Sequence, residues 1–96
     1  MYGLIGRIRA VKDGRDELAA ILAGIGDMPG CLSYVVALEE SDPQALWVTE
    51  VWESAEAHQA SLGLPSVQSA IEQGRPLIAA FDQRIETEPI GAIGLP

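Results

Sequence analysis

Hydrophobic residues recur along this chain in two rhythms, one typical of β-strands and the other of helices. Four stretches have the first rhythm: Tyr2 to Arg9, Cys31 to Glu39, Ala45 to Trp52 and Ala79 to Glu88. Because strand side chains alternate between faces, the third stretch should present two sets: Trp47, Thr49 and Val51, and opposite them Val48, Glu50 and Trp52. Both sets contain apolar bulk, which indicates a sheet covered on two sides.

The stretches between the strands carry the helical rhythm. Apolar residues at i, i+3, i+4 and i+7 predict an amphipathic helix of about eleven residues: Leu18, Ile21, Leu22 and Ile25. Ser54 is a suitable N-cap for a helix over 55–62. Pro65 should begin a further helical segment that runs to about Arg75.

The predicted order of elements is β-α-β-β-α-β, with the second helical part broken in two. This is the order of the α+β ferredoxin-like fold, in which a four-stranded antiparallel sheet carries its helices on one face. Alternation in the last strand places Phe81, Gln83 and Ile85 on one face. The helix-free face is expected to be apolar, and the short helical segments cannot cover both faces. We therefore expect a homodimer with sheets packed face to face, and a cavity between the sheet and the helices.

Size and charge limit the assembly and its partners. The 96 residues make one domain over 1–96, and 48% of them are hydrophobic, which again favours self-association. The apolar tail 89–96 (PIGAIGLP) is expected to pack on the partner subunit. A formal charge of −8 repels phosphate backbones and anionic lipid, so we expect no nucleic-acid or membrane partner. No apolar run reaches the ~20 residues of a membrane span and no secretion signal opens the chain, so we expect a cytoplasmic location.

Few residues carry candidate chemistry. Cys31 is the only cysteine and His58 the only histidine, so we expect neither an intrachain disulfide nor a metal site. Imidazole titrates near neutral pH, which makes His58 a candidate base or acid, whereas the simpler interpretation is a partly exposed helix residue. Trp52 and Tyr34 would either line a pocket or fill the core.

Several short motifs in the chain lie at a spacing found in a known family: Pro29-Gly30-Cys31 with Tyr34, Val51-Trp52-Glu53-Ser54 followed by Glu56-Ala57, then Leu62, Pro65 and Phe81. With these motifs the chain resembles, over nearly its whole length, the antibiotic biosynthesis monooxygenases, a family of dimeric α/β barrels that includes quinol monooxygenase-like proteins. The resemblance implies oxidation of a small hydroxylated aromatic or quinol by dioxygen, with no metal or flavin cofactor. Such chemistry needs an apolar pocket, an acceptor near the hydroxyl group and a donor facing the oxyanion.

With this resemblance we expect His58 as the catalytic residue, and Trp52, Tyr34, Arg7 and Ser61 as substrate-binding residues. Many family members have a histidine at the position of Ser61, and His58 lies three residues earlier on the same helix face. Arg7 stands where haem-degrading relatives have an asparagine, and the chain contains no asparagine, so haem oxygenation is not expected. Two interpretations of Arg7 stay open, a solvated strand edge and an inward side chain paired with a carboxylate such as Glu50.

Two other functions remain open on the same scaffold. One is a non-catalytic dimer that binds a small apolar ligand, which the missing family histidine favours. The other is a lactone isomerase-like enzyme that consumes no oxygen. The fold alone does not choose among these functions.

Overall fold

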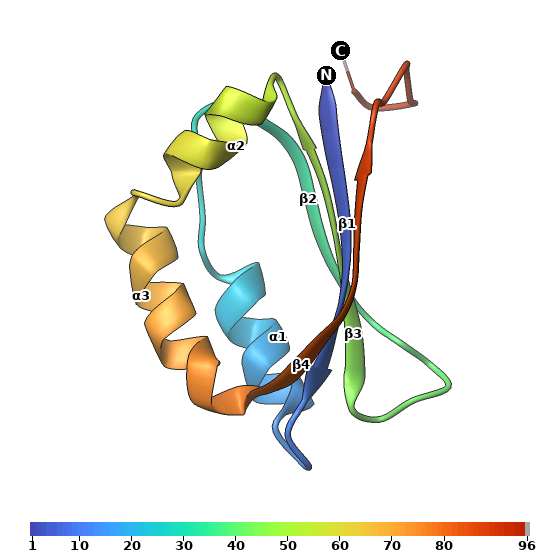
Figure 1. The fold of residues 1–96 in the computed structure, drawn as a ribbon, viewed down its shortest axis with the longest axis vertical. Helices are drawn as coiled ribbons and strands as arrows, with labels where there is room; N and C mark the ends of the chain where they lie inside the picture. Colours follow the sequence, from blue (N-terminus) through green and yellow to red (C-terminus); the bar gives the residue numbers. More distant parts are fainter. Residues whose placement is uncertain (96) are drawn as a thin grey trace.

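In a computed structural model, which describes residues 1–95, a four-stranded sheet carries all of the α-helices on one face (Figure 1). The elements follow one another as β1 (Tyr2–Ala10), α1 (Arg15–Ala23), β2 (Cys31–Leu38), β3 (Ala45–Trp52), α2 (Ala55–Ser61), α3 (Pro65–Gly74), a 3-10 turn (Arg75–Leu77) and β4 (Ile78–Thr87). The strand order is β2-β3-β1-β4, and every neighbouring pair is antiparallel. The predicted ferredoxin-like α+β fold is confirmed.

The helix boundaries follow from local sequence. The Ser54 hydroxyl oxygen accepts a hydrogen bond of 3.1 Å from the backbone N–H of Ala57, which confirms it as the N-cap of α2. Helix α1 ends at Ala23, earlier than expected, because Gly24 closes its last turn and Gly26 has a positive φ of 85°. The sheet side of the helix layer is filled near α1 by a core cluster: Ile8, Ala10, Leu18, Leu46 and Val48.

The expected face of the last strand is wrong at one point. Phe81 lies opposite Ile8, whereas Ile85 lies opposite Ile5, and the register shifts between these pairs. Directly paired residues point to the same face of a sheet, so Phe81 and Ile85 point to opposite faces. An extra residue at the bulge inverts the alternation, and the sequence carries no mark of it.

The expectation that the helix-free face is apolar is wrong for one of its halves. The half near the β2–β3 connection carries arginines and carboxylates in ion pairs, centred on Arg7. The other half has apolar or small side chains, including Ile5, Val35, Val51 and Ile85. This helix-free surface is therefore divided into a charged end and an apolar end.

In the segment after β4, Pro89 lies beside Gly3 of β1, and the residues that follow it up to Leu95 belong to no helix or strand (Figure 1). Ile90 is 96% exposed and Ile93 is fully exposed. Packing of this tail on a partner subunit stays a prediction, and Pro96 lies outside the described residues. No helix within residues 1–95 has the length and hydrophobicity needed to cross a membrane.

Candidate functional site

A cavity of about 390 Å³ lies between the helix layer and the sheet. All four strands and all three α-helices contribute to its walls, which are mainly apolar. Its aromatic and polar lining residues are Tyr34, Glu50, Trp52, His58, Ser61, Phe81, Gln83 and Arg84. An apolar cavity with a few convergent polar groups is the usual form of a small-molecule site.

A glycine on the sheet and a break between two short helices leave this space unfilled. Gly6 lies on the cavity floor between Leu4 and Ile8, and a Cβ there would meet only the Gln83 carbonyl oxygen at 3.8 Å. The break between α2 and α3 lies in the same helix layer (Figure 1), and Leu62 within it lines the cavity. On the β4 side the cavity is open to solvent, since Phe81 is 72% exposed.

Trp52 connects the other groups in the cavity. Its side chain is only 1% exposed, and its indole N–H donates a hydrogen bond of 3.0 Å to Oε1 of Glu50. Its ring meets that of His58 edge to face, with centroids 5.4 Å apart. The predicted pocket-lining role of Trp52 therefore coincides with a largely buried core position.

Glu50 has no cation to neutralise it. None of the ion pairs formed within residues 1–95 involves this carboxylate. Its charge acts on Tyr34, which lies opposite it on β2. The pKa of the Tyr34 hydroxyl is raised to about 12, first by burial and second by the negative charge of Glu50. Tyr34 is therefore a neutral hydrogen-bond donor in the cavity at physiological pH.

His58 and Ser61 lie on the cavity side of α2. The His58 ring lies between Trp52 and Tyr2, with its centroid 5.6 Å from that of Tyr2. Ser61 is only 4% exposed, and its hydroxyl donates to the backbone carbonyl of His58 at 2.6 Å. The hydroxyl proton of Ser61 is thus used within the helix, and only its oxygen is left to accept.

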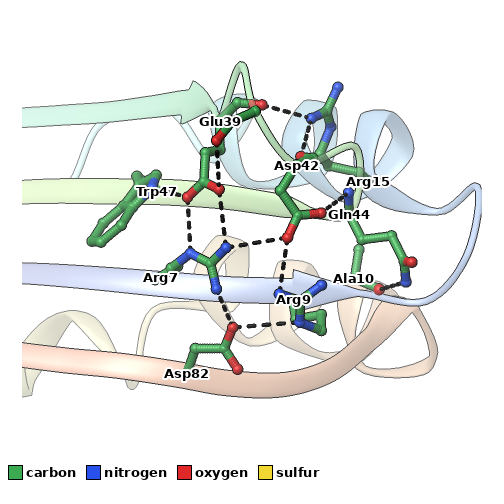
Figure 2. Close-up of polar contacts among 10 residues, drawn as sticks. Arg7, Arg9, Ala10, Arg15, Glu39, Asp42, Gln44, Trp47 and Asp82 are labelled. Atoms are coloured by element: carbon green, nitrogen blue, oxygen red, sulfur yellow. Dashed lines mark hydrogen bonds and ion pairs between the residues drawn. The ribbon is translucent and has the colours of Figure 1, made fainter.

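Arg7 is not part of this cavity. It lies on the helix-free face, where its guanidinium donates to both oxygens of Glu39 at 2.9 and 3.0 Å, to Asp42 at 3.2 Å and to Asp82 (Figure 2). Arg7 is paired with carboxylates, as one interpretation expected, but not inward with Glu50, because alternation along β1 turns it away from Ile8 and from the helices. The other interpretation, a solvated strand edge, is wrong, since β1 is an inner strand of the sheet.

This network fixes several protonation states. The hydrogen bond with Glu39 raises the pKa of Arg7, and the same bond, followed by one from the Trp47 indole, lowers the pKa of Glu39 to about 2. The backbone N–H of Gln44 and then Arg9 lower the pKa of Asp42. These carboxylates are ionised at neutral pH and are held by structure, so they are not available to a ligand.

The structure thus brings together Tyr34, Trp52, His58 and Ser61, and leaves Arg7 out. Glu50 lines the cavity but was not among the predicted site residues. It could have been found, because it lies two residues before Trp52 on β3 and therefore on the same face. Arg84 had no such signal, because the β4 bulge decides its face. Within residues 1–95 there is no group of three or more histidine, cysteine, aspartate or glutamate residues arranged to hold a metal ion.

Comparison with known proteins decides the family. The family model of antibiotic biosynthesis monooxygenases matches residues 1–73. The chain belongs to this family. A candidate antibiotic biosynthesis monooxygenase from Chloroflexus aurantiacus is 59% identical, over 99% of this chain and 98% of that chain, with a TM-score of 0.96. A search of curated proteins finds no match.

More distantly similar solved structures share the fold. The structure of a candidate antibiotic biosynthesis monooxygenase from Deinococcus radiodurans is 27% identical over 96% of this chain and 95% of that chain, with a TM-score of 0.79. One from Nitrosomonas europaea is 13% identical over 95% of this chain and 100% of that chain, with a TM-score of 0.81, and shows the fold alone. The resemblance inferred from the sequence motifs is confirmed.

Proposed function

We propose that this protein is a monooxygenase that oxidises a small hydroxylated aromatic or quinol with dioxygen in the cavity between sheet and helices. The observation that carries the proposal is the meeting of Tyr34, Glu50, Trp52 and His58 in a largely apolar space of about 390 Å³. Membership of the antibiotic biosynthesis monooxygenase family supports the reaction class. The cavity volume suits a ligand of one or a few aromatic rings.

The substrate can supply all the electrons that this reaction requires. A phenol with a hydrogen on the para carbon reacts with one dioxygen to give a quinone and one water. The hydroxyl proton leaves first, and the resulting phenolate passes an electron to oxygen. Recombination forms a hydroperoxide on the ring carbon, which loses water to leave the second carbonyl. One oxygen atom enters the product and the other becomes water, so the proposal requires no metal or flavin.

In this proposal the protein binds the substrate and manages its proton. His58 is the base or hydrogen-bond partner of the hydroxyl group, as an imidazole can both accept and return a proton. Trp52 and Tyr34 line the ring-binding surface, and the protonated Tyr34 hydroxyl can donate to a developing oxyanion. Ser61 contributes an acceptor oxygen to the same wall.

Oxygen uptake with a panel of quinols and polycyclic phenols, in the presence of a chelator, tests the proposal. Wild-type protein should consume oxygen with at least one panel member. His58→Ala should lower that rate by about 10²-fold or more, while Gln59→Ala, an exposed neighbour outside the cavity, should not. Absence of substrate-dependent uptake across the panel would refute the monooxygenase assignment.

A binding function without turnover is the second candidate. Ser61, which replaces the histidine common in the family, uses its proton on the His58 carbonyl and supplies no base. Ligands that quench tryptophan fluorescence but cause no oxygen uptake would favour this function over catalysis.

We further propose that two copies pair through the apolar half of the helix-free face. Val35 and Ile85 are exposed there, and all of the helices formed by residues 1–95 lie on the other face of the sheet (Figure 1). Val35→Arg should shift the sedimentation profile from dimer to monomer, whereas Ala55→Arg, at the start of α2 on the helix layer, should not. Deleting 90–96 tests the tail, since loss of a clasp on the partner would weaken the dimer. A wild-type protein that sediments as a monomer would end this proposal.

A further inference from the structure

The cavity contains one carboxylate, and its surroundings differ from those of other acidic side chains in the sheet region. Glu50 lies on β3, with Leu4 opposite it on β1 and Tyr34 opposite it on β2, so it sits on the cavity floor between the two flanking strands. Oε1 accepts the Trp52 indole N–H, and Oε2 accepts no hydrogen bond from within residues 1–95. One carboxylate oxygen is therefore fixed and the other is free to meet a ligand.

We propose that Glu50 sets the charge selectivity of the cavity: its free oxygen accepts a hydrogen bond from a donor group of a neutral aromatic other than the reacting hydroxyl, and its negative charge excludes aromatic carboxylates. The inference rests on the proposed function only in taking this cavity as the substrate site. It names the substrate class more narrowly, as hydroxylated aromatics that carry no carboxylate.

The apolar walls make this charge effective. The cavity walls around Glu50 are mainly apolar side chains, and a charge pair interacts more strongly beside such walls than in water. A carboxylate placed there disfavours a second carboxylate held close to it, whereas a neutral donor group gains a charge-assisted hydrogen bond. Burial is the larger cause of the raised pKa of Tyr34, and the charge of Glu50 is the second.

Other titratable groups that face the cavity do not cancel this charge. Arg84 lies at the exposed rim, with its guanidinium 3.4 Å from the Glu86 carboxylate, so its charge is both solvated and paired. His58 lies across Trp52 from Glu50, and no hydrogen bond joins the two side chains within the described residues. Tyr34 is neutral at physiological pH. The floor of the cavity is therefore negative, and among residues 1–95 the arginine that lines it, Arg84, lies at the rim.

A matched pair of ligands tests the inference without turnover. The probes are 6-hydroxy-2-naphthamide and 6-hydroxy-2-naphthoate, which share the ring and the phenol and differ in charge at neutral pH. Calorimetry on wild-type protein should give an affinity for the amide about tenfold or more above that for the carboxylate. Glu50→Gln keeps an oxygen for the Trp52 N–H and removes the charge, so it should reduce this preference to about threefold or less, chiefly by tighter binding of the carboxylate.

Two controls keep the result specific. Glu40→Gln removes one negative charge from the exposed β2–β3 connection and should leave both affinities unchanged, which separates the local charge from the net −8. Retained binding of the amide by Glu50→Gln reports that the variant is folded.

Equal affinities in the wild type, a preference unchanged in Glu50→Gln, or no binding of either probe would each overturn the inference. Oxygen uptake without charge preference would leave the proposed function standing and refute Glu50 as the selector. Charge preference without oxygen uptake would support Glu50 as the selector and refute the proposed oxygenase function.

Discussion

The two tryptophans of β3 make the same contact on opposite faces of the sheet, in opposite surroundings. On the helix-free face, the Trp47 indole donates to Glu39 at 2.8 Å. On the cavity face, the Trp52 indole donates to Glu50 at 3.0 Å. Glu39 also accepts two hydrogen bonds from the Arg7 guanidinium, one on each carboxylate oxygen, whereas Glu50 has no ion pair within residues 1–95. Both carboxylates accept an indole N–H, and they differ in that only Glu39 is also paired with a cation.

The difference separates a structural carboxylate from an available one. Glu39 and Asp42 lie at and just beyond the end of β2, and their bonds to Arg7 and Arg9 fasten the β2–β3 connection over β1 (Figure 2). Arg15 at the start of α1 holds the same connection through the carbonyl groups of Glu39 and Asp42. Glu50 bonds only Trp52 on its own strand and, within residues 1–95, links no two elements in this way. An unneutralised carboxylate in an apolar cavity costs stability, and such costs are concentrated at functional sites.

Truncating each tryptophan should give the largest contrast between the two faces. Trp52→Ala empties a fully buried position and should lower the free energy of unfolding by about 3–5 kcal/mol. Trp47→Ala should cost less, because Trp47 is only partly buried. Urea unfolding followed by circular dichroism measures both values. A larger loss in Trp47→Ala would mean that the charged face, rather than the cavity side, holds the sheet together.

Removing the shared cation should give the next largest effect. Arg7→Met leaves Glu39, Asp42 and Asp82 close together without their central partner, so their mutual repulsion adds to the lost hydrogen bonds. We expect a clear fall in Tm by calorimetry at neutral pH. Arg84→Met breaks one exposed pair and should change Tm little. Ligand binding in the cavity should survive Arg7→Met at temperatures where the variant is folded, and its loss there would contradict the separation of the two faces.

Acid should weaken the charged face selectively. The pKa of Glu39 is about 2 in the folded protein, below its usual value of 4.5. Its contribution to stability is therefore complete above about pH 5 and is lost as the pH falls through 4.5 toward 2. Thermal unfolding between pH 6 and pH 2 should show a shallower acid decline in Glu39→Gln than in the wild type. Parallel curves for the two proteins would show that other carboxylates control acid unfolding.

The sequence predicts the fold well because its signals are local. Alternation assigned β1 and β3, and Ser54 and Pro65 marked the starts of α2 and α3. The bulge in β4 escaped prediction, since it depends on how β4 pairs with β1 and not on any residue type within β4. The face of Phe81 was therefore recovered only from the three-dimensional pairing.

The candidate site was predictable only in part, for a similar reason. Trp52, His58 and Ser61 fall within one short stretch of sequence, so a local motif pointed to them together. Arg7 was grouped with them although its carboxylate partners come from the β2–β3 connection and from β4, which are distant in sequence. Polar networks of this kind depend on tertiary contacts, and composition or periodicity does not reveal them.

The smallest expected effect tests whether the charge of Glu50 is felt inside the cavity. Tyr2 and Tyr34 are the only tyrosines, so a Tyr2→Phe background leaves the Tyr34 ionisation alone in the ultraviolet titration. Its pKa should be about 12, and adding Glu50→Gln should lower it only part of the way toward 10.0, because burial is the larger cause. Glu39→Gln, on the other face, should not move it. Because the pKa of Tyr34 is raised in the folded protein, the contribution of neutral Tyr34 to the free energy of unfolding is complete below pH 10 and is lost as the pH rises toward 12. Since this loss favours unfolding during a slow titration, stopped-flow pH jumps should be used to record the ionisation before unfolding. A Tyr34 pKa unchanged by Glu50→Gln would mean that solvent or a counterion already neutralises Glu50, and the contrast between the two carboxylates would then be lost.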